Sequence, residues 1–348
     1  MQILVTGGCG FIGSHMVVEL VKKYDCIIVD NLSNSKRSIV DKMEKIVGKK
    51  IKFYEMDLCN KEDVEKIFRK NVIDAVIHFA GLKAVNESVK NPVMYYKNNL
   101  TSTLNLLEVM RKYKVLKFIF SSSATVYGEN ESPLREEMRI GEGITNPYGR
   151  TKYMIEEILK DYSNTDKKLQ IICLRYFNPV GAHISGLIGE DPNGVPNNIM
   201  PYINRVALQN NTMHYLDDKY KKLQIFGGDY KTEDGTAVRD YIHIDDLIEG
   251  HIKALEKIRR GFNRINLGTG KGVSVLELVR TYEKINNVKI PFEIVDRREG
   301  DLEEVFCDCK KAKNDIDWEA KKTVEEMCLS SWNYQCKNEP SLIVSNFE

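Results

Sequence analysis

A glycine-rich turn near the start of the chain places the strongest constraint on its fold. Residues 3–6 form a short apolar run, and residues 6–13 read Thr-Gly-Gly-Cys-Gly-Phe-Ile-Gly, just before a helical pattern. Glycines at Gly7, Gly10 and Gly13 let the backbone turn tightly and let a pyrophosphate approach the helix N-terminus, where N–H groups and the helix dipole favour an anion. The turn therefore predicts a βαβ unit that binds a dinucleotide.

Short apolar runs alternate with longer amphipathic segments over the first 180 residues. Runs that are rich in Val, Ile and Phe and only 4 to 6 residues long are typical of strands buried on both faces of a parallel sheet. The alternation predicts an α/β fold with a doubly wound parallel sheet of the Rossmann type. The expected strands are Ile3–Thr6, Cys26–Asp30, Ile51–Glu55, Ala75–Ala80, Phe118–Ser122 and Gln170–Arg175.

The pattern changes near residue 181, where Gly and Pro become frequent and the periodicity weakens. We therefore expect a dinucleotide-binding Rossmann domain at residues 1–180 and a smaller α/β substrate-binding domain at residues 181–348. The run Arg264–Gly268 again has the composition of a strand and is a candidate for returning to the main sheet.

The charge balance argues against several functions. A chain of 348 residues with a formal net charge of +1 is not expected to bind nucleic acid or an anionic membrane through general electrostatics. We find no apolar run long enough to span a membrane and no signal-peptide pattern, so we expect a cytosolic enzyme. The eight cysteines lack zinc-ligand spacing, and we expect reduced, packing cysteines and no metal site.

An acidic residue at the end of the second predicted strand indicates which dinucleotide is bound. Asp30 lies about 20 residues beyond Gly7, near the spacing expected for a carboxylate that hydrogen-bonds the adenine ribose hydroxyls. A carboxylate at that position repels the extra phosphate of NADP. The sequence therefore predicts NAD as the cofactor.

A second group of residues predicts acid–base chemistry. The fifth predicted strand ends in a run of serines that includes Ser123, and Tyr148 and Lys152 stand four residues apart at the start of a helical pattern. Residues four apart lie on one face of a helix. A Lys⁺ about 5 Å from the phenol, at an effective dielectric of about 20, would lower the pKa of Tyr148 by about two units. We therefore expect Tyr148 to be the base, with Ser123 orienting the same substrate hydroxyl.

These motifs resemble the extended short-chain dehydrogenase/reductase family, and within it the UDP-sugar 4-epimerases, over nearly the whole chain. The shared segments are the glycine turn at 6–13, the Ser-Ser-Ser-Ala-Thr-Val-Tyr-Gly run at 121–128, the Tyr148–Lys152 pair, and residues 30–35, 78–85, 175–182, 196–198, 238–243 and 297–301.

The resemblance implies roles for further residues. Those implied to bind NAD are Gly7, Gly10, Phe11, Ile12, Gly13, Asp30, Asn31, Leu32, Ser33, Asn34, Ser35, Asp57, Leu58, Phe79, Ala80, Gly81, Lys83, Asn98, Ser123, Tyr148, Lys152 and Phe177. Those implied to bind the UDP-sugar are Lys83, Ser123, Tyr148, Asn178, Asn198, Gln224, Phe226, Arg239, Arg298, Asp301 and Val305. Arginine suits phosphate oxygens and a carboxylate suits a ribose diol, which agrees with these roles. We interpret His243 as structural.

The implied activity is an interconversion of UDP-glucose and UDP-galactose, in which C4 is oxidised, the 4-keto sugar rotates and C4 is reduced again. A sugar-nucleotide 4,6-dehydratase is the nearest alternative, but those enzymes carry Asp-Glu where this chain has Ala124 and Thr125. A non-enzymatic NAD-sensing protein is a second alternative, and it would not require Tyr148, Lys152 and Ser123 together.

Three features bear on the finer assignment. The segment Asn210–Lys222 is longer and more polar than is usual in the family, and Val305 replaces a large aromatic residue found in some members. A smaller residue at 305 predicts that UDP-GlcNAc and UDP-GalNAc are also accepted. Apolar helix faces at Leu100–Met110 and Ile155–Tyr162 are either the interface of a homodimer, as the resemblance implies, or covered within the monomer.

Overall fold

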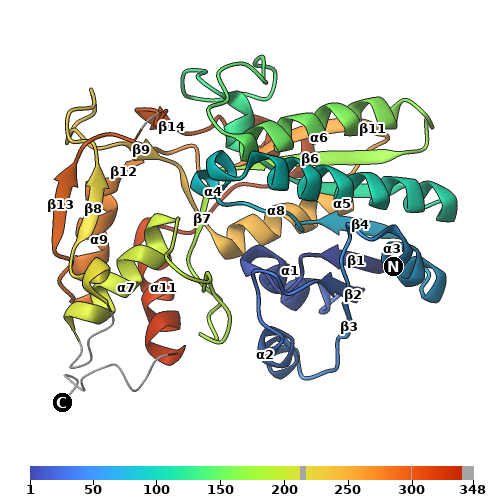
Figure 1. Ribbon diagram of the computed structural model, residues 1–348, viewed down its shortest axis with the longest axis horizontal. Helices are drawn as coiled ribbons and strands as arrows, with labels where there is room; N and C mark the ends of the chain where they lie inside the picture. Colours follow the sequence, from blue (N-terminus) through green and yellow to red (C-terminus); the bar gives the residue numbers. More distant parts are fainter. Residues whose placement is uncertain (212–216, 299, 339–348) are drawn as a thin grey trace.

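Seven parallel strands form the main sheet of the computed structural model, which describes residues 1–211, 217–298 and 300–338 (Figure 1). The strand order is β11-β6-β5-β4-β1-β2-β3, and it confirms the predicted Rossmann-type fold. The strands are β1 (Gln2–Thr6), β2 (Asp25–Asp30), β3 (Lys52–Glu55), β4 (Ala75–His78), β5 (Lys117–Ser123), β6 (Gln170–Tyr176) and β11 (Gly261–Leu267).

Two strands, β3 and β4, are shorter than the sequence predicts because backbone groups at one end find other partners. The N–H of Ala80 donates to the side chain of Thr6, so β4 ends at His78 rather than at Ala80. The N–H of Ile51 donates to Glu44, so β3 begins one residue later than expected. Both differences follow from side-chain acceptors that compete with the strand ladder.

Helices cover both faces of this sheet. Neighbouring residues of β1 point to opposite faces, as the pleat of a strand requires: Ile3 and Val5 belong to one apolar cluster, and Leu4 belongs to the other. The first face is covered by α1 (Phe11–Leu20), α2 (Ser38–Val47) and α8 (Ile244–Lys257), and the second by α3 (Lys61–Lys70), α5 (Pro92–Tyr113) and α6 (Pro147–Ser163).

The apolar faces of α5 and α6 are mostly buried within the chain. Leu107, Met110, Ile155 and Leu159 lie in the second core cluster. Leu104 was expected on the same face as Leu107 and Met110, but its side chain is 43% exposed. The two helices pack against each other in the monomer, so this packing accounts for most of the apolar pattern.

The later half of the chain forms a smaller α/β part beside the main sheet (Figure 1). Its three small sheets and its helices pack around a third apolar cluster. The strands are β7 (Asn178–Val180), β8 (Leu223–Phe226), β9 (Val238–Arg239), β10 (Tyr241–His243), β12 (Val273–Ser274), β13 (Phe292–Val295) and β14 (Glu304–Val305). The helices include α7 (Ile199–Asn210), α9 (Val275–Asn286) and α11 (Val324–Asn338).

Two segments depart from a simple division at residue 181. The strand β11 pairs in parallel with β6 at the edge of the main sheet, and α8 covers that sheet as well.

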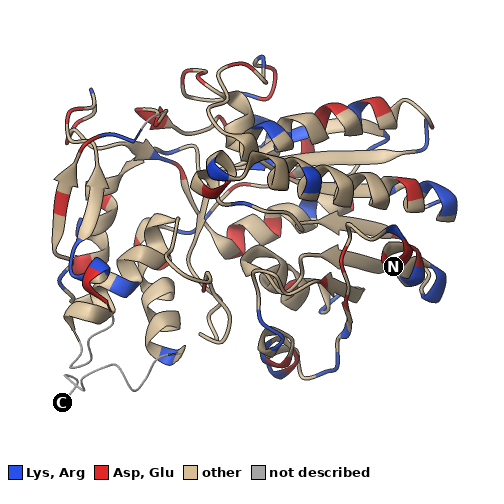
Figure 2. Cartoon of the chain, viewed as in Figure 1, with Lys and Arg blue, Asp and Glu red and all other residues tan. Residues whose placement is uncertain are grey.

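Of the long segment Asn210–Lys222, residues 212–216 lie outside the described residues, and a short 3-10 turn, η2, spans Asp218–Tyr220. Basic and acidic residues are interspersed along the helices and loops (Figure 2). Across the described ranges, no helix is both long and apolar enough to cross a bilayer.

An ion pair buried without any solvent exposure joins α6 to β6. Arg175 donates to both carboxylate oxygens of Glu156, at 2.9 and 2.5 Å, and Ser122 donates to the same carboxylate at 2.5 Å. The guanidinium lies 4.8 Å from the ring centroid of Tyr127. The carboxylate raises the pKa of Arg175 and thereby offsets the desolvation of the guanidinium. This pair fixes α6, which carries Tyr148 and Lys152, against the centre of the sheet.

We predict that Arg175→Met lowers the free energy of unfolding by about 3–5 kcal/mol, because it leaves the Glu156 carboxylate buried without its charge partner. The double variant Arg175→Met/Glu156→Leu should recover most of that loss, since it removes both charges. Urea denaturation measures both effects. Glu65→Gln, which breaks the exposed pair with Lys112, serves as a control and should leave stability unchanged. Equal stabilities for Arg175→Met and the wild type would contradict this account.

Candidate active site

A cleft of about 670 Å³ opens where β1, β2, β4, β5 and β6 end. Parallel strands bring all their carboxyl ends to one edge of a sheet, which is where ligands bind in open α/β folds. The cleft is lined by nearly all the residues expected at the NAD site, namely Gly7, Gly10, Phe11, Ile12, Gly13, Asp30, Asn31, Ser33, Asn34, Ser35, Asp57, Leu58, Phe79, Ala80, Gly81, Lys83, Asn98, Ser123, Tyr148, Lys152 and Phe177. Leu32 is the exception, because its side chain packs against the core.

The glycine turn leaves room beside the start of α1. Gly7 has φ of +66°, and a Cβ there would lie 2.7 Å from the backbone nitrogen of Ala80. A Cβ on Gly13 would lie 2.2 Å from the carbonyl oxygen of Gly7, so only glycine permits this approach of helix and turn. No side chain caps α1 at Gly10. The open helix N-terminus facing the cleft fits a pyrophosphate.

Asp30 is fixed at the end of β2 by three donors. One carboxylate oxygen accepts from Leu32 N and Ser35 Oγ, each at 2.9 Å, and the other accepts from Cys9 N at 3.0 Å. The carboxylate is therefore oriented at the cleft before any ligand is bound, which suits a ribose diol.

The expected catalytic residues converge on one part of the cleft. Asn146 caps α6 by accepting from Gly149 N at 2.8 Å, so the helix begins at Pro147 and places Tyr148 and Lys152 one turn apart. Lys152 Nζ lies 5.7 Å from the ring centroid of Tyr148 and donates to the carbonyl of Ser121 at 2.7 Å. Ser123, at the end of β5, shares a hydrogen bond with Tyr148.

The expected effect of Lys152 on the phenol is wrong for the chain by itself. Burial raises the pKa of Tyr148, and only the hydrogen bond from Ser123 acts in the lowering direction. Burial also lowers the pKa of Lys152 to about 8. The expectation considered the charge of Lys152 and omitted the desolvation of the phenol, which is the largest influence on its pKa.

The residues expected at the UDP end form a second cluster. Arg239, on β9, makes an ion pair with Asp301, and the guanidinium of Arg298 lies 3.8 Å from the ring centroid of Phe226 on β8. Val305 pairs with Arg239 between β14 and β9. Asn198, Lys83, Ser123 and Tyr148 line the large cleft, whereas Asn178, Gln224, Phe226, Arg239, Arg298, Asp301 and Val305 do not.

Sequence reasoning missed several cleft residues. Tyr176 at the end of β6 hydrogen-bonds the side chain of Ser121, and both residues line the cleft. Glu190 and Asp191 reach it from the loop before α7. The sequence Gly-Glu-Asp-Pro at 189–192 predicts a turn, but a turn pattern alone does not predict that its side chains face the cleft.

The described histidines are buried or half-buried and favour the neutral form. Burial lowers the pKa of His15 and His78 to about 3 and of His243 and His251 to about 4. It also lowers the pKa of His183. His243 caps α8 by accepting from Asp245 N and bonds Ser330, so its role in the fold is structural.

Comparisons with known proteins agree with this geometry. The model of the NAD dependent epimerase/dehydratase family matches residues 3–268. UDP-glucose 4-epimerase of Bacillus subtilis is 53% identical over 342 residues, which is 97% of this chain and 98% of the relative. The crystal structure of UDP-glucose 4-epimerase from Bifidobacterium longum in complex with NAD⁺ and UDP superimposes with a TM-score of 0.91 at 49% identity, over 97% of this chain and 99% of that one. The UDP-Glc/GlcNAc 4-epimerase of Campylobacter jejuni gives a TM-score of 0.80 at 35% identity, over 97% and 99% of the two chains.

The chain belongs to the NAD-dependent epimerase/dehydratase family, and NAD is its cofactor. Within that family, relatives that match it over nearly their full length include UDP-glucose 4-epimerases of several bacteria.

We predict that Tyr148→Phe lowers turnover by about 10² to 10⁴, the usual contribution of a positioned acid–base group, while UDP binding stays near normal. Turnover is measured with UDP-galactose and UDP binding by calorimetry. Tyr153→Phe, on the same helix but outside the residues that line the cleft, is a matched control and should keep its activity. Wild-type turnover in Tyr148→Phe would rule out this residue as the base.

Proposed function

We propose that this protein is an isomerase, a UDP-glucose 4-epimerase, that interconverts UDP-glucose and UDP-galactose. The observation that carries the proposal is the convergence of Tyr148, Lys152 and Ser123 on the cleft that also contains the glycine turn and Asp30. The full-length similarity to UDP-glucose 4-epimerases supports the same activity.

In the proposed reaction, Tyr148 Oη accepts the proton of the sugar 4-hydroxyl and later returns it. Ser123 Oγ bonds the same hydroxyl and holds it toward the phenol. Lys152 places a positive charge beside the ring and bonds the Ser121 carbonyl, which fixes the ammonium on the sheet side of α6. NAD, when bound, supplies the hydride acceptor and donor for C4, together with a positive ring that opposes the effect of burial on the phenol.

The UDP part of the substrate is held in place while its sugar ring stays free to rotate. We propose that Asn178, Asn198, Arg239, Arg298 and Asp301 hold the UDP part, because guanidinium groups match phosphate oxygens and a carboxylate matches a ribose diol. A fixed UDP lets the 4-keto sugar turn over between the two hydride transfers without leaving the protein.

Incubation of the purified protein with UDP-galactose alone tests the proposed function. An epimerase whose NAD stays bound equilibrates the sugar nucleotide with UDP-glucose and needs no added cofactor. A dehydratase would instead form a 4-keto-6-deoxy sugar, and a sensor would leave UDP-galactose unchanged. Either of these two results would reject the proposal.

We also propose that the enzyme is a cytosolic homodimer. Val89 on α4 (Val85–Lys90) and Val93, Met94 and Leu104 on α5 are exposed apolar side chains on neighbouring helices. Such a face supports contact with a second copy. Light scattering of the purified protein gives the oligomeric state directly.

The pocket for the sugar leads to a prediction about substrate breadth. Val305 pairs with Arg239 and packs beside the apolar cluster that contains Phe177, which lines the cleft. We propose that a small residue here leaves room for an N-acetyl group at C2, so UDP-GlcNAc and UDP-GalNAc are interconverted as well. Val305→Tyr should reduce N-acetyl turnover by about 5- to 150-fold, equivalent to an overpacking cost of about 1–3 kcal/mol, and should spare UDP-galactose.

Assays of both sugar pairs on the wild type and on Val305→Tyr measure this effect, and Val305→Ala controls for loss of the side chain. Absence of UDP-GlcNAc turnover in the wild type, or undiminished N-acetyl activity in Val305→Tyr, would show that this position does not limit the pocket.

A further inference from the structure

Two consecutive carboxylates, Glu190 and Asp191, reach across the cleft from the loop between β7 and α7. Glu190 Oε1 accepts from Lys83 Nζ at 3.0 Å, and Asp191 Oδ2 accepts from Lys36 Nζ at 2.8 Å. Lys83 follows β4 and Lys36 follows β2, so both lysines belong to the wall expected to hold NAD. The two acidic residues therefore join the two walls of the cleft, and we name them the carboxylate strap.

Glu190 also holds the side-chain amide of Asn198 in place. The same Oε1 atom accepts from Asn198 Nδ2 at 2.7 Å. Asn198 stands at the N-cap of α7, yet its side chain does not cap that helix. One carboxylate oxygen thus fixes two side chains, Lys83 and Asn198, that both line the cleft and are both expected to contact ligand.

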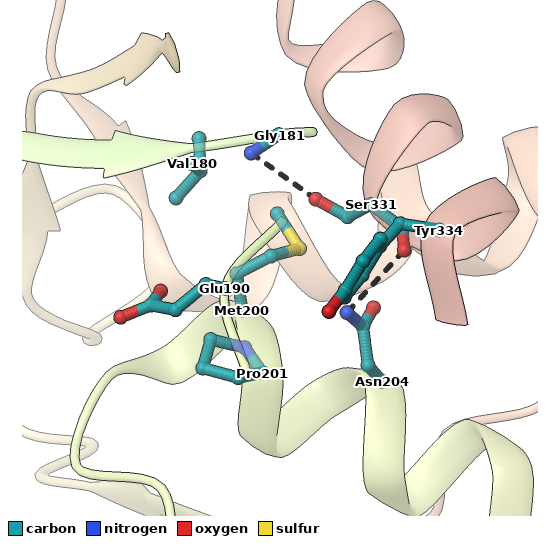
Figure 3. A pocket seen from close by; sticks show the side chains of 8 residues that line it. All are labelled: Val180, Gly181, Glu190, Met200, Pro201, Asn204, Ser331 and Tyr334. Atoms are coloured by element: carbon teal, nitrogen blue, oxygen red, sulfur yellow. Dashed lines mark hydrogen bonds between the residues drawn. The ribbon is translucent and has the colours of Figure 1, made fainter. Parts of the chain in front are cut away.

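The second oxygen of Glu190 has no partner. Its side chain is 8% exposed, and Oε2 is buried without a hydrogen bond to any described residue. Figure 3 shows the side chain extending away from Asn204 and Tyr334, with which it lines a small cavity beside α7. A buried acceptor left unsatisfied is costly. The carboxylate is therefore held through Oε1 alone, by Lys83 and Asn198, at a cost in stability.

We infer that Glu190 is a positioning residue of the proposed active site, and that the carboxylate strap slows the release of NAD. The inference rests on the proposed function. Glu190 holds Lys83 and Asn198 in place across the cleft through its Oε1 atom. Asp191 secures the same loop to Lys36 at the mouth of the NAD wall.

Glu190→Gln tests the first part, because it keeps the shape of the side chain and removes its charge. Loss of a charge-assisted bond predicts that NAD leaves about 10-fold faster during gel filtration and that KM for UDP-galactose rises about 5- to 10-fold. The value of kcat should stay within about 2-fold of the wild type, since no reacting atom touches Glu190. Bound NAD is measured by absorbance after denaturation, which does not depend on activity.

A double-variant cycle identifies the partner. If Glu190 acts through Lys83, then Glu190→Gln combined with Lys83→Met should lose NAD no faster than the worse single variant. Strictly additive losses would mean that the two residues act separately and would overturn the inference. Lys83→Met replaces an exposed side chain, so it also tests the pair if Glu190→Gln fails to fold.

The ion pair of Asp191 and Lys36 is more exposed than that of Glu190 and Lys83. We therefore test it by exchanging the two charges. Asp191→Lys alone should raise the rate of NAD loss by about 2- to 5-fold, and Lys36→Glu in the same chain should restore it. Glu293→Gln on β13, which breaks the exposed pair with Lys222, is the control and should retain NAD as the wild type does.

Two outcomes separate the failure of this inference from failure of the proposed function. Wild-type NAD retention and KM in Glu190→Gln, with normal epimerase activity, would overturn the strap alone. A wild-type protein that binds NAD but does not epimerise UDP-galactose would reject the proposed function. Retention of NAD in the variants would still test the strap in that case.

Discussion

Parallel pairing of seven strands is the constraint on which the site depends. In a parallel sheet every carboxyl end lies on the same edge, so the turn after β1, the acid at the end of β2, the loop after β4 and the serines at the end of β5 meet there. The helix α6 is placed by side-chain contacts. Its position is set by the buried pair of Glu156 and Arg175 and by the bond from Lys152 to the Ser121 carbonyl.

This arrangement separates rigid parts from adjustable ones. The residues proposed for proton transfer stand on β5 and α6, both held by buried contacts. The residues proposed for UDP stand on short strands and loops of the smaller part, where Arg239 and Asp301 pair with each other. A reaction that turns the sugar while the nucleotide stays in place benefits from that division, because the acid–base geometry does not have to move with the sugar.

Much of the fold, together with the glycine turn and Asp30, followed from local patterns in the sequence, whereas most other residues of the NAD wall were implied by the family resemblance. Strand runs of Val, Ile and Phe, the glycine turn and the Tyr148–Lys152 spacing each encode their structure within a few residues. The pairing of β11 with β6 joins segments far apart in the chain, and a short apolar run alone does not specify a partner. The role of Glu190 was missed for a related reason, because it depends on a contact with Lys83, which lies far away in the sequence. The direction of the Tyr148 shift was wrong because helical spacing gives the distance between two charges but not their desolvation.

The histidines carry a consequence for the proton balance of the molecule. Desolvation lowers the pKa of every described imidazole, and for His15, His78, His243 and His251 the pKa lies near 3 or 4, so these four rings exchange few protons between mildly acidic and mildly alkaline solution. Desolvation also lowers the pKa of the Lys152 ammonium at the cleft, to about 8. Protons taken up or released by Lys152 when a ligand binds therefore stand against little background from these four rings, and calorimetry in buffers of different ionisation enthalpy measures them.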